Sequence, residues 1–179
     1  MLRAGARLLQ LRVKAEGDAR FLALAEALAR ASQTSGARLI VNDRADIARL
    51  AGAGGVHVGQ DDLSVEHVRA IVGRSATIGI STHDRRQIDE AIAGDADYVA
   101  VGPVFGTSTK DTGYEPRGLD LVSYAAGRGK PVVAIGGITL DRAPAVVAAG
   151  ASYLAIISDL LATGDPERRA WDYSRLGGA

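Results

Sequence analysis

Residues 64–83 have the sequence SVEHVRAIVGRSATIGISTH, and this stretch decides the fold class. Ser64–Val72 has helical spacing and opens on a serine, a typical helix cap, while Gly73 stands where a helix should end. A short apolar run, Ala76–Ile80, follows at once and leads into the polar residue Ser81. A helix that ends at glycine and passes quickly into a buried strand is typical of a parallel sheet covered by helices.

The same step recurs along the chain. Strands are predicted at Arg7–Arg12, Arg38–Asn42, Gly55–Val58, Ala76–Ile80, Tyr98–Val101, Val132–Ile135 and Ser152–Ile157. Helices are predicted at Asp18–Ser35, Ser64–Val72, Asp84–Ala93 and Asp141–Ala149, with caps at Asp18, Ser64, Asp84 and Asp141 and stops at Gly36, Gly73, Gly94 and Gly150.

Seven such strands fit either a doubly wound sheet or a (β/α)8 barrel. Polar side chains at the carboxyl end of nearly every strand favour the barrel, whose active sites lie there. The sequence also lacks the Gly-x-Gly-x-x-Gly that opens the first helix of a dinucleotide-binding fold. Because a barrel needs eight strands, we expect a single TIM-barrel domain over residues 1–179 that lacks its first strand and most of its first helix.

Composition excludes several classes of protein. The 179 residues are 47% apolar and 23% charged, as in one compact soluble domain. Lys plus Arg and Asp plus Glu both number 21, and this balance argues against a generic nucleic-acid binder. The absence of cysteine excludes disulfide scaffolds, cysteine zinc sites and thiol catalysis. With no apolar run of about 18 residues and no signal peptide, we expect a cytoplasmic protein that binds small molecules rather than nucleic acid or membrane.

The first predicted strand carries cations at its end. Alternation puts Gln10, Arg12 and Lys14 on one face and Leu11 and Val13 on the other. If the apolar pair faces the helices, an amide and two cations lie inside the barrel mouth, where they need an anion such as a di- or triphosphate. The alternative is a solvated strand end with its charges turned outward.

Carboxylates follow the next two strands. Asn42 and Asp43 end one of them, and Asp62 comes shortly after the next. Adjacent parallel strands lie about 4.8 Å apart, so Asp43 and Asp62 can converge on one ion. Two carboxylates beside a phosphate site suggest Mg²⁺. The alternative is that each aspartate caps the helix that follows it.

Three further segments indicate anion binding. The loop Gly102–Lys110 is rich in glycine and hydroxyl groups and holds one lysine, although a plain surface loop is the alternative. Gly136-Gly137 and Ile157-Ser158 follow the last two predicted strands, and barrels often build phosphate sites there. His83 is either structural or a proton-transfer group. His57, inside a strand, is interpreted as packing.

The ordered set of motifs resembles the thiamine phosphate synthases, in a superfamily shared with the thiazole tautomerases. The matching segments are Gln10-Leu11-Arg12-x-Lys14, Val41–Arg44, Gly55–Asp62, Gly79–His83, Gly102–Phe105, Thr107–Lys110, Ala134–Ile138 and Ile157-Ser158.

The resemblance implies a barrel that joins a hydroxymethylpyrimidine diphosphate to a thiazole phosphate and releases diphosphate. It implies that the pyrimidine diphosphate is bound by Gln10, Arg12, Lys14, Asn42, Ser81 and Lys110, of which Arg12, Lys14, Ser81 and Lys110 are the expected catalytic residues. It implies Mg²⁺ on Asp43 and Asp62. The thiazole phosphate is expected at Thr107, Ser108, Thr109, Gly136, Gly137, Ile157 and Ser158.

Two other functions stay open. A thiazole tautomerase would use His83 as an acid–base group, but it has no diphosphate to expel, and the retained cations and carboxylates argue against it. The third possibility is a non-catalytic, ligand-binding remnant of the barrel. Neither composition nor motif specifies an oligomeric state.

Overall fold

The computed structural model describes residues 1–107 and 113–176, and these form a parallel sheet of seven strands in chain order. The strands are β1 (Leu8–Leu11), β2 (Arg38–Asn42), β3 (Gly55–Val58), β4 (Thr77–Thr82), β5 (Tyr98–Val101), β6 (Val132–Ile135) and β7 (Tyr153–Ala155). The helices are the 3-10 turn η1 (Leu2–Ala4), α1 (Asp18–Thr34), α2 (Ala45–Leu50), α3 (Val65–Val72), α4 (Arg85–Ala93), α5 (Gly118–Ala125), α6 (Ala143–Ala148), α7 (Ser158–Leu161) and α8 (Pro166–Ser174). Within these residues, every helix is too short or too polar to cross a membrane.

The chain divides into two compact units. The amino-terminal unit contains Leu2 and Ala6–Ile80, and the carboxyl-terminal unit contains Met1, Arg3–Gly5 and Ser81–Ala179. Each unit repeats the alternation of strand and helix that the sequence predicts.

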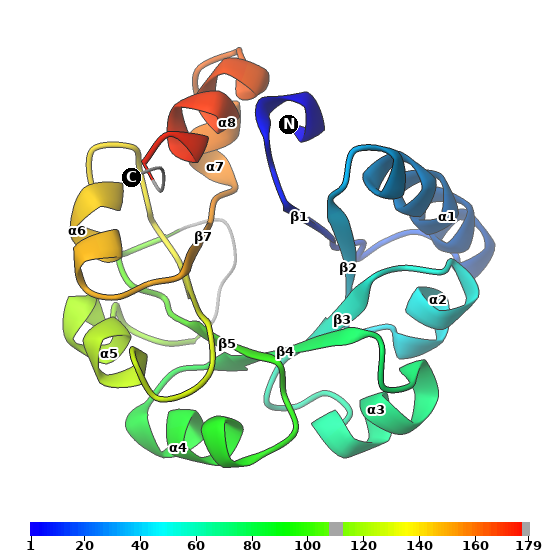
Figure 1. Ribbon diagram of the computed structural model, residues 1–179, viewed down its shortest axis with the longest axis horizontal. Helices are drawn as coiled ribbons and strands as arrows, with labels where there is room; N and C mark the ends of the chain where they lie inside the picture. Colours follow the sequence, from blue (N-terminus) through cyan, green and yellow to red (C-terminus); the bar gives the residue numbers. More distant parts are fainter. Residues whose placement is uncertain (108–112, 177–179) are drawn as a thin grey trace. The chain divides into compact units, whose positions relative to one another are not determined.

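In the amino-terminal unit, β1 to β4 pair in parallel, with Leu8 beside Arg38, Ile40 beside Gly55 and Gly55 beside Thr77. Figure 1 shows α1, α2 and α3 in succession along one side of β1 to β3. The centre of β2 is almost wholly buried, since Leu39–Val41 are at most 2% exposed. Strands covered in this way read as continuous apolar runs, and this is why their bounds could be predicted.

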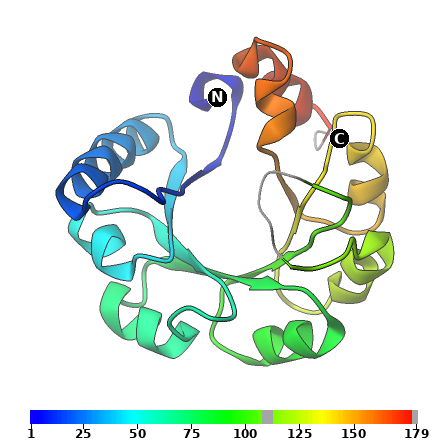
Figure 2. The same cartoon turned by 180° about the vertical axis from the view of Figure 1, so that it is seen from behind.

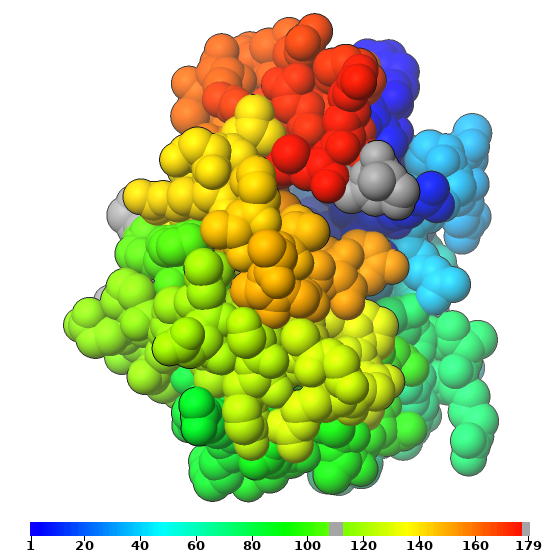
Figure 3. Space-filling view, turned by 60° about the vertical axis from the view of Figure 1, so that its left-hand side comes forward, coloured from blue at the N-terminus to red at the C-terminus, as the bar shows by residue number. Residues whose placement is uncertain are grey.

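In the carboxyl-terminal unit, β5 pairs with β6 and β6 with β7, again in parallel. Helices α4, α5 and α6 follow β4, β5 and β6, and the reverse view in Figure 2 shows the same succession. Figure 3 shows the surface that α5 to α8 form, from yellow-green to red. The Arg3 guanidinium, from the start of the chain, pairs with Glu167 of α8 at 2.9 Å.

Most predicted elements are confirmed, and two predicted caps are wrong. Ser64 and Asp84 do cap α3 and α4, accepting hydrogen bonds from backbone N–H groups three residues ahead. Asp18, however, is the first residue of α1, behind Gly17 at the N-cap. Asp141 lies one residue before Arg142, which occupies the N-cap of α6. Both carboxylates still lie near a helix start, where the helix dipole favours negative charge.

Candidate active site

The cationic end of β1 lies beside the end of β2 in the amino-terminal unit. Gln10 and Arg12 are exposed while Leu11 between them is buried, as alternation predicts. Arg12 Nη1 donates a long hydrogen bond of 3.4 Å to Asn42 Oδ1. Asn42 is 7% exposed, so β2 holds this amide firmly and the amide orients the guanidinium. Lys14, also exposed, follows two residues later. Three of the predicted diphosphate-binding residues therefore lie along β1 and just beyond it, and a fourth contacts Arg12.

Asp43 stands in an unusual backbone conformation directly after β2. Its φ is +63°, in the left-handed region that residues with a side chain seldom adopt. The Asp43 N–H donates to the His57 carbonyl of β3 at 2.8 Å, and this bond ties the ends of the two strands together. Backbone strain of this kind is concentrated at functional sites.

Asp62 closes the turn that follows β3. Its Oδ2 accepts a hydrogen bond of 2.7 Å from the Gly59 N–H. Ser64 caps the following helix α3, and Arg44 occupies the N-cap of α2 with its guanidinium paired to Asp18 and Asp46. Neither Asp43 nor Asp62 therefore occupies the N-cap position of the helix that follows it.

The two carboxylates of Asp43 and Asp62 fit a magnesium ion whose other ligands are waters and substrate phosphates. In the part of the chain that the structure describes, no three His, Asp or Glu side chains form a group that could hold a metal. Mg²⁺ needs no such cage, because proteins usually bind it through one or two carboxylates together with waters and substrate phosphates. Asp43 directly follows β2 and Asp62 lies four residues beyond the neighbouring strand β3, and a metal ion shared by these two carboxylates stays a prediction.

The end of β4 belongs to the carboxyl-terminal unit, where Ser81 is half-buried and His83 is held from several sides. The His83 Nδ1 lies 2.6 Å from the Gly102 carbonyl, so Nδ1 carries the proton. Its backbone N–H donates to Gln87 Oε1 at 2.7 Å. The ring stacks on Tyr114 at 4.0 Å between centroids. These contacts fix the position of the His83 ring. No pattern in the sequence indicated that Tyr114 would stack on it.

The loops after β5 and β6 pack backbone against backbone. Phe105 N–H donates to the Gly136 carbonyl at 3.0 Å. Gly137 has φ +61°, and a Cβ atom there would lie 2.4 Å from the Gly106 carbonyl oxygen. Only glycine fits such a place. The predicted pair Gly136-Gly137 therefore joins two loops of this unit, and Thr107 lies just beyond their contact. Ser108, Thr109 and Lys110 lie outside the described residues.

Ile157 and Ser158 begin α7, where Ser158 is its first residue and both side chains are exposed. Behind them, the Tyr173 hydroxyl donates to Asp159 Oδ2 at 2.6 Å, and Arg169 Nε lies 3.4 Å from the same oxygen. Burial and the neighbouring Asp159 carboxylate raise the pKa of Tyr173. This cluster fixes α7 against α8, and no motif in the sequence indicated it.

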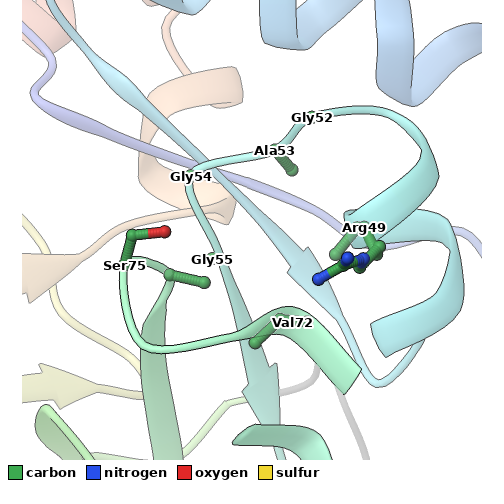
Figure 4. A pocket seen from close by; sticks show the side chains of 9 residues that line it. Arg49, Gly52, Ala53, Gly54, Gly55, Val72 and Ser75 are labelled. Carbon is green, nitrogen blue, oxygen red and sulfur yellow. The ribbon is translucent and has the colours of Figure 1, made fainter. Parts of the chain in front are cut away.

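A hollow of about 480 Å³ lies elsewhere, at the amino end of β3 (Figure 4). It is lined by Ala48-Arg49, the loop Gly52–Gly55, Val72 and Ser75-Ala76. Asp43 and Asp62 follow the opposite, carboxyl ends of β2 and β3, so the hollow is no part of the predicted site.

The sequence of this chain matches a known protein family. The sequence profile of the family described as thiamine monophosphate synthase matches residues 1–160. The chain belongs to that family. A thiamine-phosphate synthase from Azoarcus is 46% identical over 171 residues, covering 94% of this chain and 82% of the relative. The resemblance stated from the motifs is confirmed, and so is the expectation of a transferase of thiamine biosynthesis.

Solved structures that resemble this chain have barrel-like folds. A thiamine phosphate pyrophosphorylase from Pyrococcus furiosus has a TM-score of 0.91 at 28% identity, covering 98% of this chain and 85% of that protein. A 3-hexulose-6-phosphate synthase has a TM-score of 0.71 at 21% identity, covering 95% of this chain and 86% of that one, and shows the fold alone. A parallel α/β fold with TIM-barrel-like neighbours is thus confirmed. The missing first strand stays a prediction.

Proposed function

We propose that this chain joins 4-amino-2-methyl-5-(diphosphooxymethyl)pyrimidine to 4-methyl-5-(2-phosphooxyethyl)thiazole, giving thiamine phosphate and diphosphate. The observation that carries the proposal is the group at the ends of β1 and β2. There Arg12 contacts the buried Asn42 at 3.4 Å, and the strained Asp43 follows directly. Cations next to a carboxylate suit a substrate that brings both a diphosphate and a metal ion.

In this proposal Gln10, Arg12, Lys14 and Asn42 bind the pyrimidine diphosphate, together with Ser81 and Lys110. Asp43 and Asp62 hold Mg²⁺, which when bound neutralises charge on the leaving diphosphate. Arginine and lysine serve different purposes here. The Arg12 fork can bind two phosphate oxygens at once, while Lys14 acts as a point charge.

The proposed reaction is dissociative. The bond between the pyrimidine methylene carbon and the diphosphate oxygen breaks first, and its electron pair leaves with the diphosphate. The thiazole nitrogen then donates its lone pair to the methylene cation, forming the new C–N bond. No proton is removed from the nucleophile, so the chain needs no general base. What it must supply is stabilisation of negative charge on the leaving group, often the largest catalytic effect.

The thiazole phosphate is assigned to the loops of the carboxyl-terminal unit. The assigned residues are Thr107, Ser108, Thr109, Gly136, Gly137, Ile157 and Ser158. Support comes from the tight packing of the Gly136-Gly137 turn, which fixes its backbone, and from the exposed Ser158 hydroxyl at the start of α7.

The test is diphosphate release with both substrates and Mg²⁺, in the parent chain, Asp62→Asn and Asp61→Asn. Asparagine at 62 can still accept the Gly59 hydrogen bond but loses the charge, so turnover that depends on Mg²⁺ should be abolished while the fold is kept. Asp61 is an exposed neighbour of the same type, and its variant should turn over normally. Equal turnover by both variants would refute the metal role of Asp62. Binding of both substrates in calorimetry without turnover by the parent chain would favour a ligand-binding remnant.

A further inference from the structure

The hollow at the amino end of β3 has the size of a small-molecule site. It is an open hollow of about 480 Å³ between the loop that enters β3 and the loop that enters β4. Pockets for small ligands span about 300–1,000 Å³. Apart from Arg49 its lining residues are small or apolar, and they include Gly54 and Gly55 with Ser75 beside them (Figure 4). The one large polar side chain in this lining is therefore a cation.

Arg49 is held in place by the end of a neighbouring helix. Its Nη1 donates to the Ile71 carbonyl of α3 at 3.1 Å. That bond uses one of the five N–H groups of a guanidinium. Arg69, by contrast, donates to the Gly73 and Ala76 carbonyls at 3.2 and 2.6 Å, and so braces the loop that forms one wall. Arg69 has a structural role, and Arg49 faces the hollow.

The chain segments that line the hollow, 48–55 and 72–76, carry charge of one sign. The segments 27–42, 47–60 and 67–80 run through the amino ends of β2, β3 and β4 and contain no Asp, Glu or Lys. Their charged residues, histidine aside, are Arg30, Arg38, Arg49, Arg69 and Arg74. Arg38 lies close, because its side chain contacts Gly54 and donates to Thr77 Oγ1. A positive potential in a concave site concentrates anions.

We propose that this hollow binds a small phosphorylated molecule, with its phosphate against the Arg49 guanidinium. A phosphate dianion matches the charge and the planar fork of arginine. The small walls leave room for a compact organic group and not for a macromolecule. The site lies at the opposite end of the strands from Asp43 and Asp62, so it does not depend on the proposed function.

The experiment is a nuclear magnetic resonance titration of the full ¹⁵N-labelled chain with inorganic phosphate and, separately, with glycerol 3-phosphate. The amide signals of Gly52, Gly54, Gly55 and Ser75 should shift and saturate, which distinguishes this hollow from phosphate bound elsewhere. Stronger binding of glycerol 3-phosphate would support an organic phosphomonoester, and equal binding would support phosphate itself.

Arg49→Met should raise the half-saturating concentration about tenfold or more, as expected for loss of one charge-assisted contact. The matched control is Arg20→Met, which removes an arginine of α1 that pairs with Glu16 at 3.2 Å, and it should leave binding unchanged. If Arg49→Met does not fold, Arg49→Lys replaces it, with a smaller loss because the fork is removed and the charge kept. Equal effects of the variants at 49 and 20, or no saturable shift with either phosphate compound, would each overturn the proposal.

Discussion

Replacing Gly137 by alanine should destabilise the fold sharply, because the glycine lies where two loops meet. Its φ of +61° disfavours any side chain, and the new Cβ would lie 2.4 Å from the Gly106 carbonyl oxygen and 2.9 Å from Phe105 Cβ. The nearest of these atoms is backbone, so no flexible side chain can move aside to relieve the overlap. The loops after β5 and β6 would have to separate.

The expected loss in free energy of unfolding is the sum of two effects. A residue with a side chain in the left-handed region costs about 1 kcal/mol. Separating the loops breaks the hydrogen bond of 3.0 Å from the Phe105 N–H to the Gly136 carbonyl, and a half-buried donor left without a partner costs about 2 kcal/mol. The total is about 3 kcal/mol, which for a chain of this length lowers the melting temperature by about 6–12 °C.

The measurement is thermal unfolding followed by circular dichroism, with Gly127→Ala as the matched control. Gly127 has φ +72° and no atom within 4 Å of its would-be Cβ, so only the backbone cost of about 1 kcal/mol applies there. The reasoning is refuted if Gly137→Ala loses no more stability than Gly127→Ala.

Three further perturbations have distinct expected results. Lys110→Ala should slow the chemical step about 10²–10³-fold in single-turnover diphosphate release, and a parental rate would contradict its assigned role. The Arg44 guanidinium holds the pKa of the Asp46 carboxyl below its usual value in the folded protein. A carboxyl whose pKa is lowered by folding stabilises the protein at pH values above its pKa in the unfolded chain, and this stabilisation is lost as the pH falls through its pKa in the folded protein. The stability gap between the parent chain and Asp46→Asn, measured by urea unfolding, should therefore close on acidification; a constant gap would argue against this. Tyr173→Phe removes the 2.6 Å hydrogen bond to Asp159 and should cost about 1–3 kcal/mol in the same assay, whereas no change would show that α7 is held otherwise.

The strands could be predicted because a strand buried on both faces appears in the sequence as a continuous apolar run. Four of them, such as Arg38–Asn42 and Tyr98–Val101, have the predicted bounds. Helix α8 was missed although Asp165 and Pro166 form a legible start, and Asp165 accepts a hydrogen bond from the Arg168 N–H at 2.9 Å. Helix α5 has no such mark, because it opens on Gly118 with φ +69°.

The candidate site also has features that could be predicted from the sequence and features that could not. Strand alternation and position predict that Arg12 and Asp43 stand at strand ends, since those are properties of one segment. The contact of Arg12 with Asn42, the strain at Asp43 and the stacking of His83 on Tyr114 each depend on how segments many residues apart are brought together. Such contacts leave no periodic pattern and were not predictable from one sequence.

A net charge of zero conceals a division of charge along β2 and β3 of the amino-terminal unit. Arg38 begins β2, and Arg49 and Arg74 lie shortly before β3 and β4, while Asp43, Asp46, Asp61, Asp62 and Glu66 follow the carboxyl ends of β2 and β3, with Arg44 among them. Helices α2 and α3 run back from the carboxyl ends of strands to amino ends, so their positive dipole ends lie among the carboxylates and their negative ends among the arginines. The division therefore follows from helix stability in part. In the proposed function, Asp43 and Asp62 would need a metal ion before a diphosphate held by Arg12 and Lys14 could lie beside them, whereas the arginine end attracts an anion directly.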